Sequence, residues 1–228
     1  DTKKVISRLE SVLKREPNHP LAIHLYIHTV EASKSPERAE RAADRLGDLI
    51  PGAGHLVHMP AHIYWRVGRY HDASNANIEA AKVDERYIAQ CNAQGFYPAL
   101  YYPHNIHFLW AASTMEGRSK LSIESALKVS KYIHDDQIKK FPTIEFFKTI
   151  PLLSYVRFQK WEEILSFPMP GEQYKFSQGI THYAKGVAKA SSGKTQEAIL
   201  DQLKIIPLKN SSEVRTLIKG GQPAGLLL

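Results

Sequence analysis

The strongest constraint on the fold is a short turn that recurs along the chain. Its clearest copies are Gly68-Arg69-Tyr70-His71-Asp72-Ala73 and Gly193-Lys194-Thr195-Gln196-Glu197-Ala198, in which glycine ends one segment and alanine follows five residues later. Related turns start at Lys34, Gly117 and Gln159, so the five turn residues are separated by 34, 49, 42 and 34 residues. Because helix–turn–helix units of ~34 residues stack into arrays, this spacing predicts an all-α chain built from helix pairs.

Other features fit helix pairs in series. Pro17 and Pro51 also lie 34 residues apart, and each follows the second helix of an expected pair. Together these features resemble the tetratricopeptide repeat family over most of residues 1–205. The resemblance implies a right-handed superhelical solenoid of antiparallel helix pairs, whose first helices line a concave groove.

We divide the chain into eight segments on this basis. They are 1–17, the second helix of a truncated repeat; 18–51, repeat 1; 52–83, repeat 2; 84–103, an aromatic insertion loop; 104–141, repeat 3; 142–170, a degenerate repeat 4; 171–210, repeat 5; and 211–228, a C-terminal tail. We expect the helix that starts near Asp72 to run on through Ile88 into the insertion. Glycine and proline mark the rest of the insertion as a loop, either a plug over the joint between repeats or a lid over the groove. We expect the tail to be frayed around Gly220–Gly225.

Composition excludes several classes of protein. Cys91 is the only cysteine, so neither a disulfide nor a cysteine zinc site can form within one chain. No apolar run approaches the ~18 residues of a membrane span. The net charge is +7, but Lys and Arg are interleaved with acids, so we expect no specific nucleic-acid binding. The chain begins at Asp1 rather than Met, and we assign no compartment.

The 11 histidines follow the repeat. Counting back from the turns at 34, 68 and 117, the positions ten residues earlier are His24, His58 and His107, those six earlier are His28, His62 and Ala111, and those thirteen earlier are Leu21, His55 and His104. Offsets of three and four residues place such side chains on one stripe of a helix. Since packed helices lie ~8–10 Å apart, imidazoles from neighbouring first helices can point at a common volume.

This pattern predicts a transition-metal site, because several neutral imidazoles at ~2.0–2.1 Å are what such ions require. The candidate ligands are His24, His28, His58, His62 and His107, with His55 and His104 as further candidates. Imidazole suits copper and zinc, which we favour, and also iron. Seven histidines exceed one tetrahedral shell, which leaves room for two ions or for supporting side chains.

Three other features belong to the predicted site. Glu31 lies one turn beyond His28 and is a candidate ligand, base or orienting partner. Pro60 either starts the helix that carries His62 or kinks it and re-aims His55 and His58. The candidate groove or substrate contacts are Tyr64, Trp65, Arg66, Tyr97 and Tyr101.

Two functions from different classes follow. The first is a metal-binding helical-repeat protein; if it is an enzyme, an open coordination position would activate water or dioxygen, giving a hydrolase or an oxidoreductase. The second is an adaptor that holds a peptide or protein partner in the groove without a metal. The sequence contains no nucleophile motif, phosphate loop or dinucleotide fingerprint that specifies another chemistry.

Overall fold

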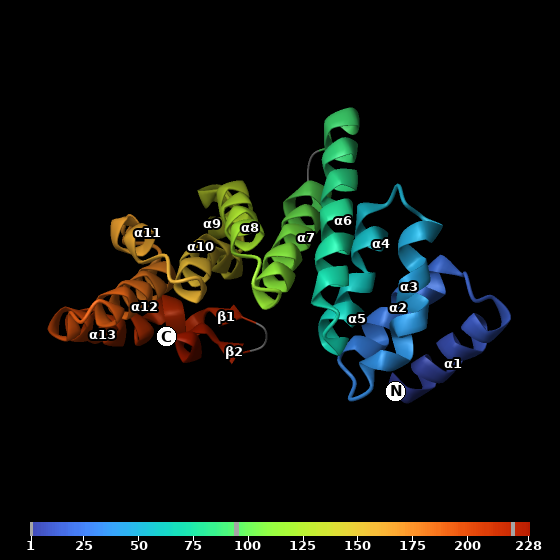
Figure 1. The fold of residues 1–228 in the computed structure, drawn as a ribbon, viewed down its shortest axis with the longest axis horizontal. Coiled ribbons are helices and arrows are strands. Elements are labelled where there is room, and N and C mark those ends of the chain that lie inside the picture. The colour runs from blue at the N-terminus through green and yellow to red at the C-terminus, as the bar shows by residue number, and fades with distance from the viewer. Residues whose placement is uncertain (1, 94–95, 220–221) are drawn as a thin grey trace. The chain divides into compact units, whose positions relative to one another are not determined.

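The structure, a computed structural model, describes residues 2–93, 96–219 and 222–228. The chain divides into two compact units, residues 1–122 and 123–228. Both are built from helices, which confirms the all-α prediction (Figure 1). The described residues also include one short antiparallel strand pair, β1 (Ile218–Lys219) with β2 (Gln222–Pro223).

The helices follow one another with short connections in both units. The first unit contains α1 (Thr2–Arg15), α2 (Pro20–Glu31), the 3₁₀ helix η1 (Pro36–Ala39), α3 (Glu40–Leu49), α4 (Gly54–His58), α5 (Pro60–Val67), α6 (Tyr70–Cys91), α7 (Phe96–Met115) and the start of α8 (Ser119–Tyr132). The second contains α9 (Asp135–Lys140), η2 (Pro142–Glu145), α10 (Phe146–Arg157), α11 (Trp161–Ser166), α12 (Lys175–Ser191), α13 (Thr195–Lys209), α14 (Ser212–Thr216) and η3 (Ala224–Leu227).

All five predicted turn residues lie between two helices. Four of them have a positive φ, namely Gly68 at 84°, Gly117 at 75°, Gln159 at 56° and Gly193 at 76°. Glycine reaches this left-handed region without a steric penalty, and a residue in that conformation ends an α-helix. The recurring turn is therefore a helix stop followed at once by a new helix.

The segment with three candidate histidines is broken into two helices. α4 ends at His58, Met59 caps it, and α5 begins with Pro60 in its first turn. Proline is tolerated there because the first backbone N–H groups of a helix have no partner within it. Pro60 thus starts a new helix directly after α4 in the chain. Both short helices pack against the long helix α6 (Figure 1).

The core of the first unit lies where α2, α3 and α5 meet, and Ile23, Leu46 and Ile63 are fully buried there. The inner stripe of α6 has small residues instead, including Ala73 and Ala80, which are also fully buried. Small side chains let the neighbouring backbones approach α6 closely. α4, α5 and α7 pack closely on α6, and α2 packs on α5, so these helices surround one volume.

The helix expected to run on through Ile88 is confirmed, whereas the loop predicted for the rest of 84–103 is wrong in its helical parts. α6 continues to Cys91 and ends at Asn92, which has a φ of 44°, and α7 already begins at Phe96. Pro98 falls in the first turn of α7, where proline is compatible with a helix, and Pro103 lies inside the same helix. Residues 94–95 lie outside the described residues.

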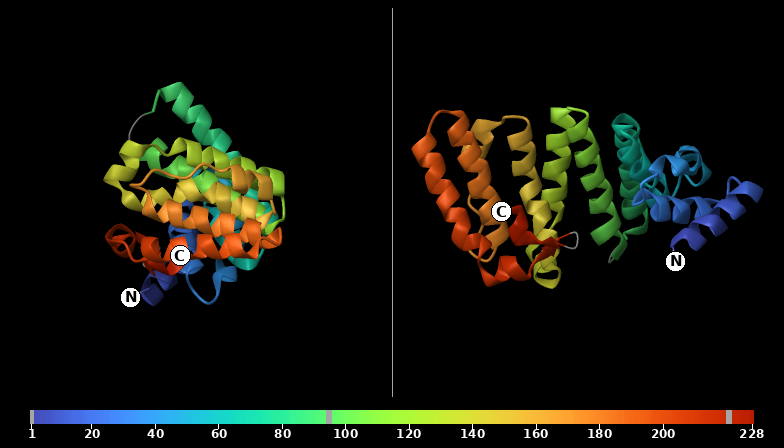
Figure 2. Two further views of the ribbon diagram at one scale, coloured as in Figure 1. Left: turned by 90° about the vertical axis from the view of Figure 1, so that its left-hand side faces the viewer. Right: turned by 90° about the horizontal axis from the view of Figure 1, so that it is seen from below.

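In the second unit, α12 and α13 run side by side and antiparallel (Figure 2). Phe176 and Ile180 of α12 form a core with Val214, Leu217 and Ala224 from the C-terminal segment. The described part of the predicted tail is therefore packed, although Gly220 and Gly221 lie outside the described residues. Among the described helices, none combines the length and apolarity needed to cross a membrane.

Candidate metal centre

Two groups of three histidines come together in the first unit. One group is His24, His28 and His55, and the other is His58, His62 and His104. In each group, one nitrogen from every ring lies within 4.8 Å of the other two. These groups, called the open triad and the buried triad below, are arrangements that could hold a metal ion.

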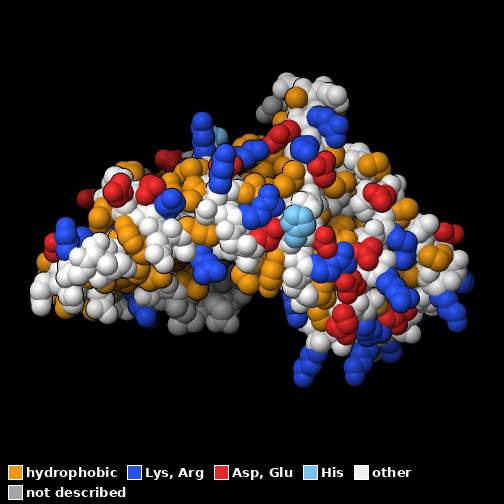
Figure 3. Space-filling model, viewed as in Figure 1, with side chains coloured by type: hydrophobic (Ala, Val, Ile, Leu, Met, Phe, Trp, Pro, Cys, Tyr) orange, Lys and Arg blue, Asp and Glu red, His pale blue; other side chains and the backbone are white. Residues whose placement is uncertain are grey.

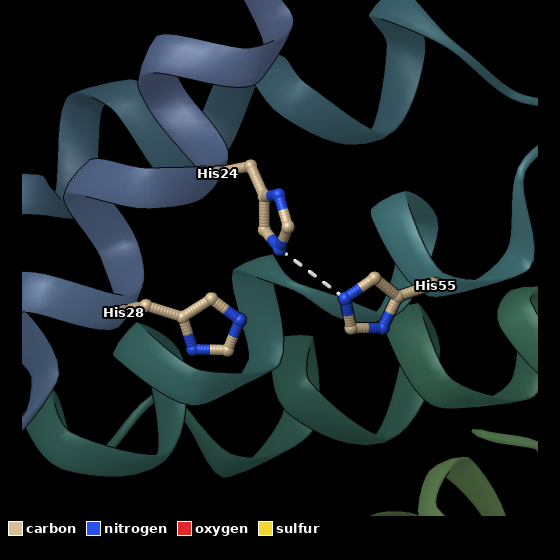
Figure 4. Close-up of side chains that lie close together, drawn as sticks. All are labelled: His24, His28 and His55. Atoms are coloured by element: carbon tan, nitrogen blue, oxygen red, sulfur yellow. Dashed lines mark hydrogen bonds between the residues drawn. The ribbon is translucent and has the colours of Figure 1, made fainter. Parts of the chain in front are cut away.

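The open triad joins two helices. His24 and His28 lie one turn apart on α2, and His55 lies on α4. Figure 4 shows the three rings facing a common space, with Nε2 of His24 and Nε2 of His55 3.2 Å apart. The side chain of His28 is 40% exposed, so this triad is accessible to solvent.

The buried triad joins three helices. His58 comes from α4, His62 from α5 and His104 from α7. Nε2 of His58 lies 2.9 Å from Nε2 of His62 and 3.1 Å from Nε2 of His104. Tetrahedral ligands at ~2.0–2.1 Å from an ion lie roughly 3.3 Å apart, so small ring rotations would bring these nitrogens to ligating distance. His58 is fully buried.

Asn77 of α6 sets the tautomer of His58. Its side-chain Nδ2 donates to the carbonyl oxygen of Ala73, which turns Oδ1 towards His58 at 2.7 Å from Nδ1. An amide oxygen only accepts, so Nδ1 of His58 must be the protonated nitrogen. The lone pair of Nε2 then points into the triad, which is the orientation that a metal ligand needs.

Glu31 orients one histidine of each triad by accepting a hydrogen bond from its Nδ1. Its carboxylate contacts Nδ1 of His62 and lies 3.4 Å from Nδ1 of His28. Burial alone would raise the pKa of Glu31, but the hydrogen bonds from His28 and His62 outweigh it and hold the pKa at about 2. Glu31 is thus ionised and serves as an orienting partner shared by the two triads.

Burial also favours the neutral form of three of these histidines. Burial, together with the neighbouring imidazoles, lowers the pKa of His55 to about 4 and that of His58 well below its usual value. Burial and the nearby His28 and His62 lower the pKa of His24 as well. Neutral imidazole is the form that ligates a metal, so these three rings are ready to bind at neutral pH.

The two triads are adjacent. The rings of His55 and His58 have their centroids 6.1 Å apart, and those of His28 and His62 lie 5.4 Å apart. Each of these pairs has one member in each triad. Two ions held by the triads would therefore be close neighbours, within reach of one small bridging molecule.

The structure places six of the seven predicted histidine ligands in the triads and leaves His107 out of both. The ring of His107 stacks on Trp110, with centroids 5.2 Å apart. On the same helix, Phe108 contacts His58, His62 and His104 and so covers the face towards the buried triad. His107 precedes Phe108 by one residue, and successive side chains of an α-helix are rotated by ~100° about its axis, so His107 points away from that face.

The other predicted contact residues have mixed positions. Tyr64 is buried and donates a 2.9 Å hydrogen bond to Asp44 of α3, so it belongs to the helix packing. Trp65 contacts Phe108, which lines the buried triad. Arg66 donates to the backbone carbonyl oxygens of Glu31 and Ser33 at the end of α2. None of these three contacts makes the residue a metal ligand.

Tyr97 and Tyr101 lie beside the open triad. The ring of Tyr101 meets His55 edge-on, with centroids 4.7 Å apart. The hydroxyl of Tyr97 donates to Asp84 at 2.7 Å. Asn105 donates to the other carboxylate oxygen of Asp84, also at 2.7 Å. Burial raises the pKa of Asp84, and these two hydrogen bonds counter that effect.

Sequence reasoning missed Asn77 and Asp84. Both are fully buried on the stripe of α6 that otherwise contains Ala73, Ala80 and Ala81. Polar residues seven positions apart on a stripe of small apolar residues are a readable signal, because a buried polar group needs a partner. That signal indicates a supporting role without naming the histidine that is supported.

The comparisons add no family assignment. No protein-family model matches the sequence, and a search of curated proteins finds no significant match.

On the face shown in Figure 3, Lys and Arg side chains are interspersed with Asp and Glu.

Proposed function

We propose that this chain is a metal-binding helical-repeat protein with a dinuclear centre, one transition-metal ion in each triad. The tetratricopeptide-like character that the sequence resembles remains part of this proposal, supported by the five helix–turn–helix connections. In the proposed fold, the first helices of successive pairs supply the ligands. α2, α5 and α7 are such helices, and α4 precedes α5.

The observation that carries the proposal is the close approach of nitrogens that cannot hydrogen-bond to one another while both rings are neutral. Nδ1 of His58 and Nδ1 of His62 both face acceptors, Asn77 and Glu31. In the neutral rings the Nε2 atoms therefore both present lone pairs, yet they lie 2.9 Å apart. Two lone pairs at that distance repel one another, and a cation between them removes the repulsion.

Charge favours copper over zinc. Imidazoles bind a metal as neutral ligands, and Glu31, which hydrogen-bonds to the rings of His28 and His62, adds one negative charge. Two divalent ions would bring a charge of about +4 into this partly buried place, whereas two monovalent copper ions bring about +2, and charge is costly to bury. Divalent copper also binds nitrogen ligands more tightly than zinc in the general affinity order. Zinc is the second candidate and iron the third.

The chemistry that fits this centre is activation of dioxygen. Two cuprous ions held side by side can together supply the two electrons that reduce dioxygen to peroxide. The open triad gives access, since His28 is 40% exposed. Hydrolysis by a zinc-bound water is the alternative, and the metal identity separates the two.

Elemental analysis of the purified chain tests the proposal. We expect two equivalents of copper per chain after reconstitution under reducing conditions. His28→Ala removes a ligand from the open triad only and should lower the content to one equivalent. His58→Ala with His62→Ala should empty the buried triad while helical circular dichroism is retained.

The matched control is a double variant of two histidines outside both triads, His71→Ala with His134→Ala, which should keep both equivalents. A metal-free wild type, or equal metal content in all variants, would overturn the proposal. That result would favour the adaptor that binds a peptide or protein without metal.

A further inference from the structure

A row of three tyrosines connects the open triad with the protein surface. It begins at Tyr101, whose ring centroid lies 4.7 Å from that of His55. Tyr97 follows at 5.2 Å from Tyr101, and Tyr87 follows at 5.4 Å from Tyr97. Tyr87 is 45% exposed. Each ring thus contacts the next, from a proposed metal ligand to solvent.

The row spans two helices with a regular spacing. Tyr97 and Tyr101 lie four residues apart on α7, and His104 lies three residues further on the same stripe. Tyr87 belongs to α6, which packs side by side with α7. Two packed helices therefore hold the rings in place.

The hydroxyl of Tyr97 has a proton acceptor. A phenol that loses an electron becomes a strong acid, so its oxidation is easy only where a base takes the proton at once. Asp84 lies 2.7 Å from the hydroxyl, within the reach needed for direct proton transfer. Asn105 holds the other carboxylate oxygen of Asp84, which fixes the acceptor in place.

We propose that Tyr101, Tyr97 and Tyr87 form a path that carries single electrons between a one-electron donor at the surface and the metal centre. This inference rests on the proposed redox-active metal centre. Electron transfer falls steeply with distance, and rings in contact divide a long transfer into short steps. Packing alone would be satisfied by phenylalanine, whereas the partly buried hydroxyl of Tyr97 and its carboxylate partner serve an oxidation.

The electrons and protons balance in the following way. Hydrogen peroxide at the centre takes up two electrons, which arrive one at a time through the tyrosines, and two protons from solvent, and leaves as two waters, so that the oxidation state of the centre is the same before and after. For each electron, Tyr97 gives one to the centre through Tyr101 and its proton to Asp84. The tyrosyl radical then takes one electron from the surface donor through Tyr87 and recovers the proton from Asp84. Two donor molecules are oxidised for each peroxide.

The experiment uses the full chain loaded with copper, hydrogen peroxide as the oxidant and ferrocyanide as the donor. We expect Tyr97→Phe and Tyr87→Phe to slow ferrocyanide oxidation by about tenfold or more, which corresponds to ~1.4 kcal/mol in barrier, with copper content unchanged. Tyr183→Phe is the matched control, because Tyr183 is 44% exposed and lies in the second unit; its rate should equal that of the wild type.

A second readout follows the radical itself. In freeze-quenched samples without ferrocyanide, the wild type should give a tyrosyl signal in electron paramagnetic resonance that Tyr97→Phe abolishes. Equal rates and equal radical signals in wild type, Tyr97→Phe and Tyr87→Phe would overturn the path while leaving the metal centre intact. Zinc as the native ion would also overturn the path alone, and absence of bound metal would overturn both proposals.

Discussion

At the scale of single residues, the hydrogen bond made by Nδ1 of a histidine decides whether Nε2 of the same ring can bind a metal ion. Asn77 holds Nδ1 of His58, and Glu31 holds Nδ1 of His62 and His28. The Nε2 atoms are then directed inwards without any metal present. This is preorganisation, since the folded chain orients the rings before an ion arrives.

Asn77→Ala tests this orientation directly. It frees Nδ1 of His58 to become the unprotonated nitrogen, so the affinity of the buried triad for copper should fall by roughly 10–100-fold. Competition with a chelator of known affinity measures the change. Asn75→Ala is the control, because Asn75 is exposed on the same helix. An unchanged affinity in Asn77→Ala would contradict the assigned tautomer.

The histidine rows were readable from the sequence because they repeat with the turns. His55 and His104 share one offset, and both join a triad. The same rule failed for His107, because Phe108 covers the face of α7 towards the buried triad. Position in a repeat thus predicts the helix and its stripe, while local rotation decides which ring reaches the site.

At the scale of helices, the position of α4 matters most, because it supplies one ligand to each triad. Gly54 begins this helix beside α6. A Cβ on Gly54 would lie 1.9 Å from Oδ1 of Asp84 and 3.1 Å from the carbonyl oxygen of Ala80. A side chain fits there only if Asp84 leaves its hydrogen bonds with Tyr97 and Asn105 or if α4 moves away from α6.

Gly54→Ala should therefore destabilise the chain by about 1–3 kcal/mol, as overpacking of a well-packed interior does. It should also weaken metal binding at both triads, since His55 and His58 would shift together. Gly52→Ala is the matched control, because a Cβ there meets nothing within 4 Å. Urea denaturation and copper titration measure the two effects; equal behaviour of the two variants would refute the close packing.

Helix ends were predicted better than helix lengths. A helix ends at Gly68 and another at Gly117, and these ends could be predicted because the left-handed conformation of glycine is a local property. The segment at 84–103 misled the prediction because Pro98 and Pro103 suggested a loop. Proline near the start of α7 does not break it, and sequence composition alone does not show where a helix starts.

At the scale of the whole molecule, the metal-free protein should lose stability in mild acid. The pKa values of His24, His55 and His58 are lowered in the folded state by burial, to about 4 for His55, from an ordinary value of 6.5. Between those values the unfolded chain binds protons that the folded chain does not. The free energy of unfolding therefore falls as the pH drops from about 6.5 to about 4.

Urea denaturation of the metal-free chain at several pH values measures this loss. Glu31, with a pKa of about 2, contributes a further loss that begins only below its ordinary value of 4.5. His55→Gln should flatten the dependence between pH 6.5 and 4, because it removes one of the titrating groups. A free energy of unfolding that is constant or rises over this range would contradict the buried, neutral histidines.

Copper should stabilise the first unit selectively. A ligand that binds only the folded state adds ~2.7 kcal/mol at a free concentration 100 times its dissociation constant. Both triads lie within residues 1–122. Hydrogen exchange should slow in α2 and in α4 to α7, while α12 and α13 exchange at the same rate with and without copper. Equal protection of both units would place the metal elsewhere.

Anomalous X-ray scattering at the copper edge, from crystals of the copper-loaded chain, tests the central claim most directly. The account predicts two anomalous peaks, one among His24, His28 and His55 and the other among His58, His62 and His104, each at ~2.0–2.1 Å from its nitrogens. The absence of any peak between these rings, or a peak bound only by residues outside the triads, would contradict it.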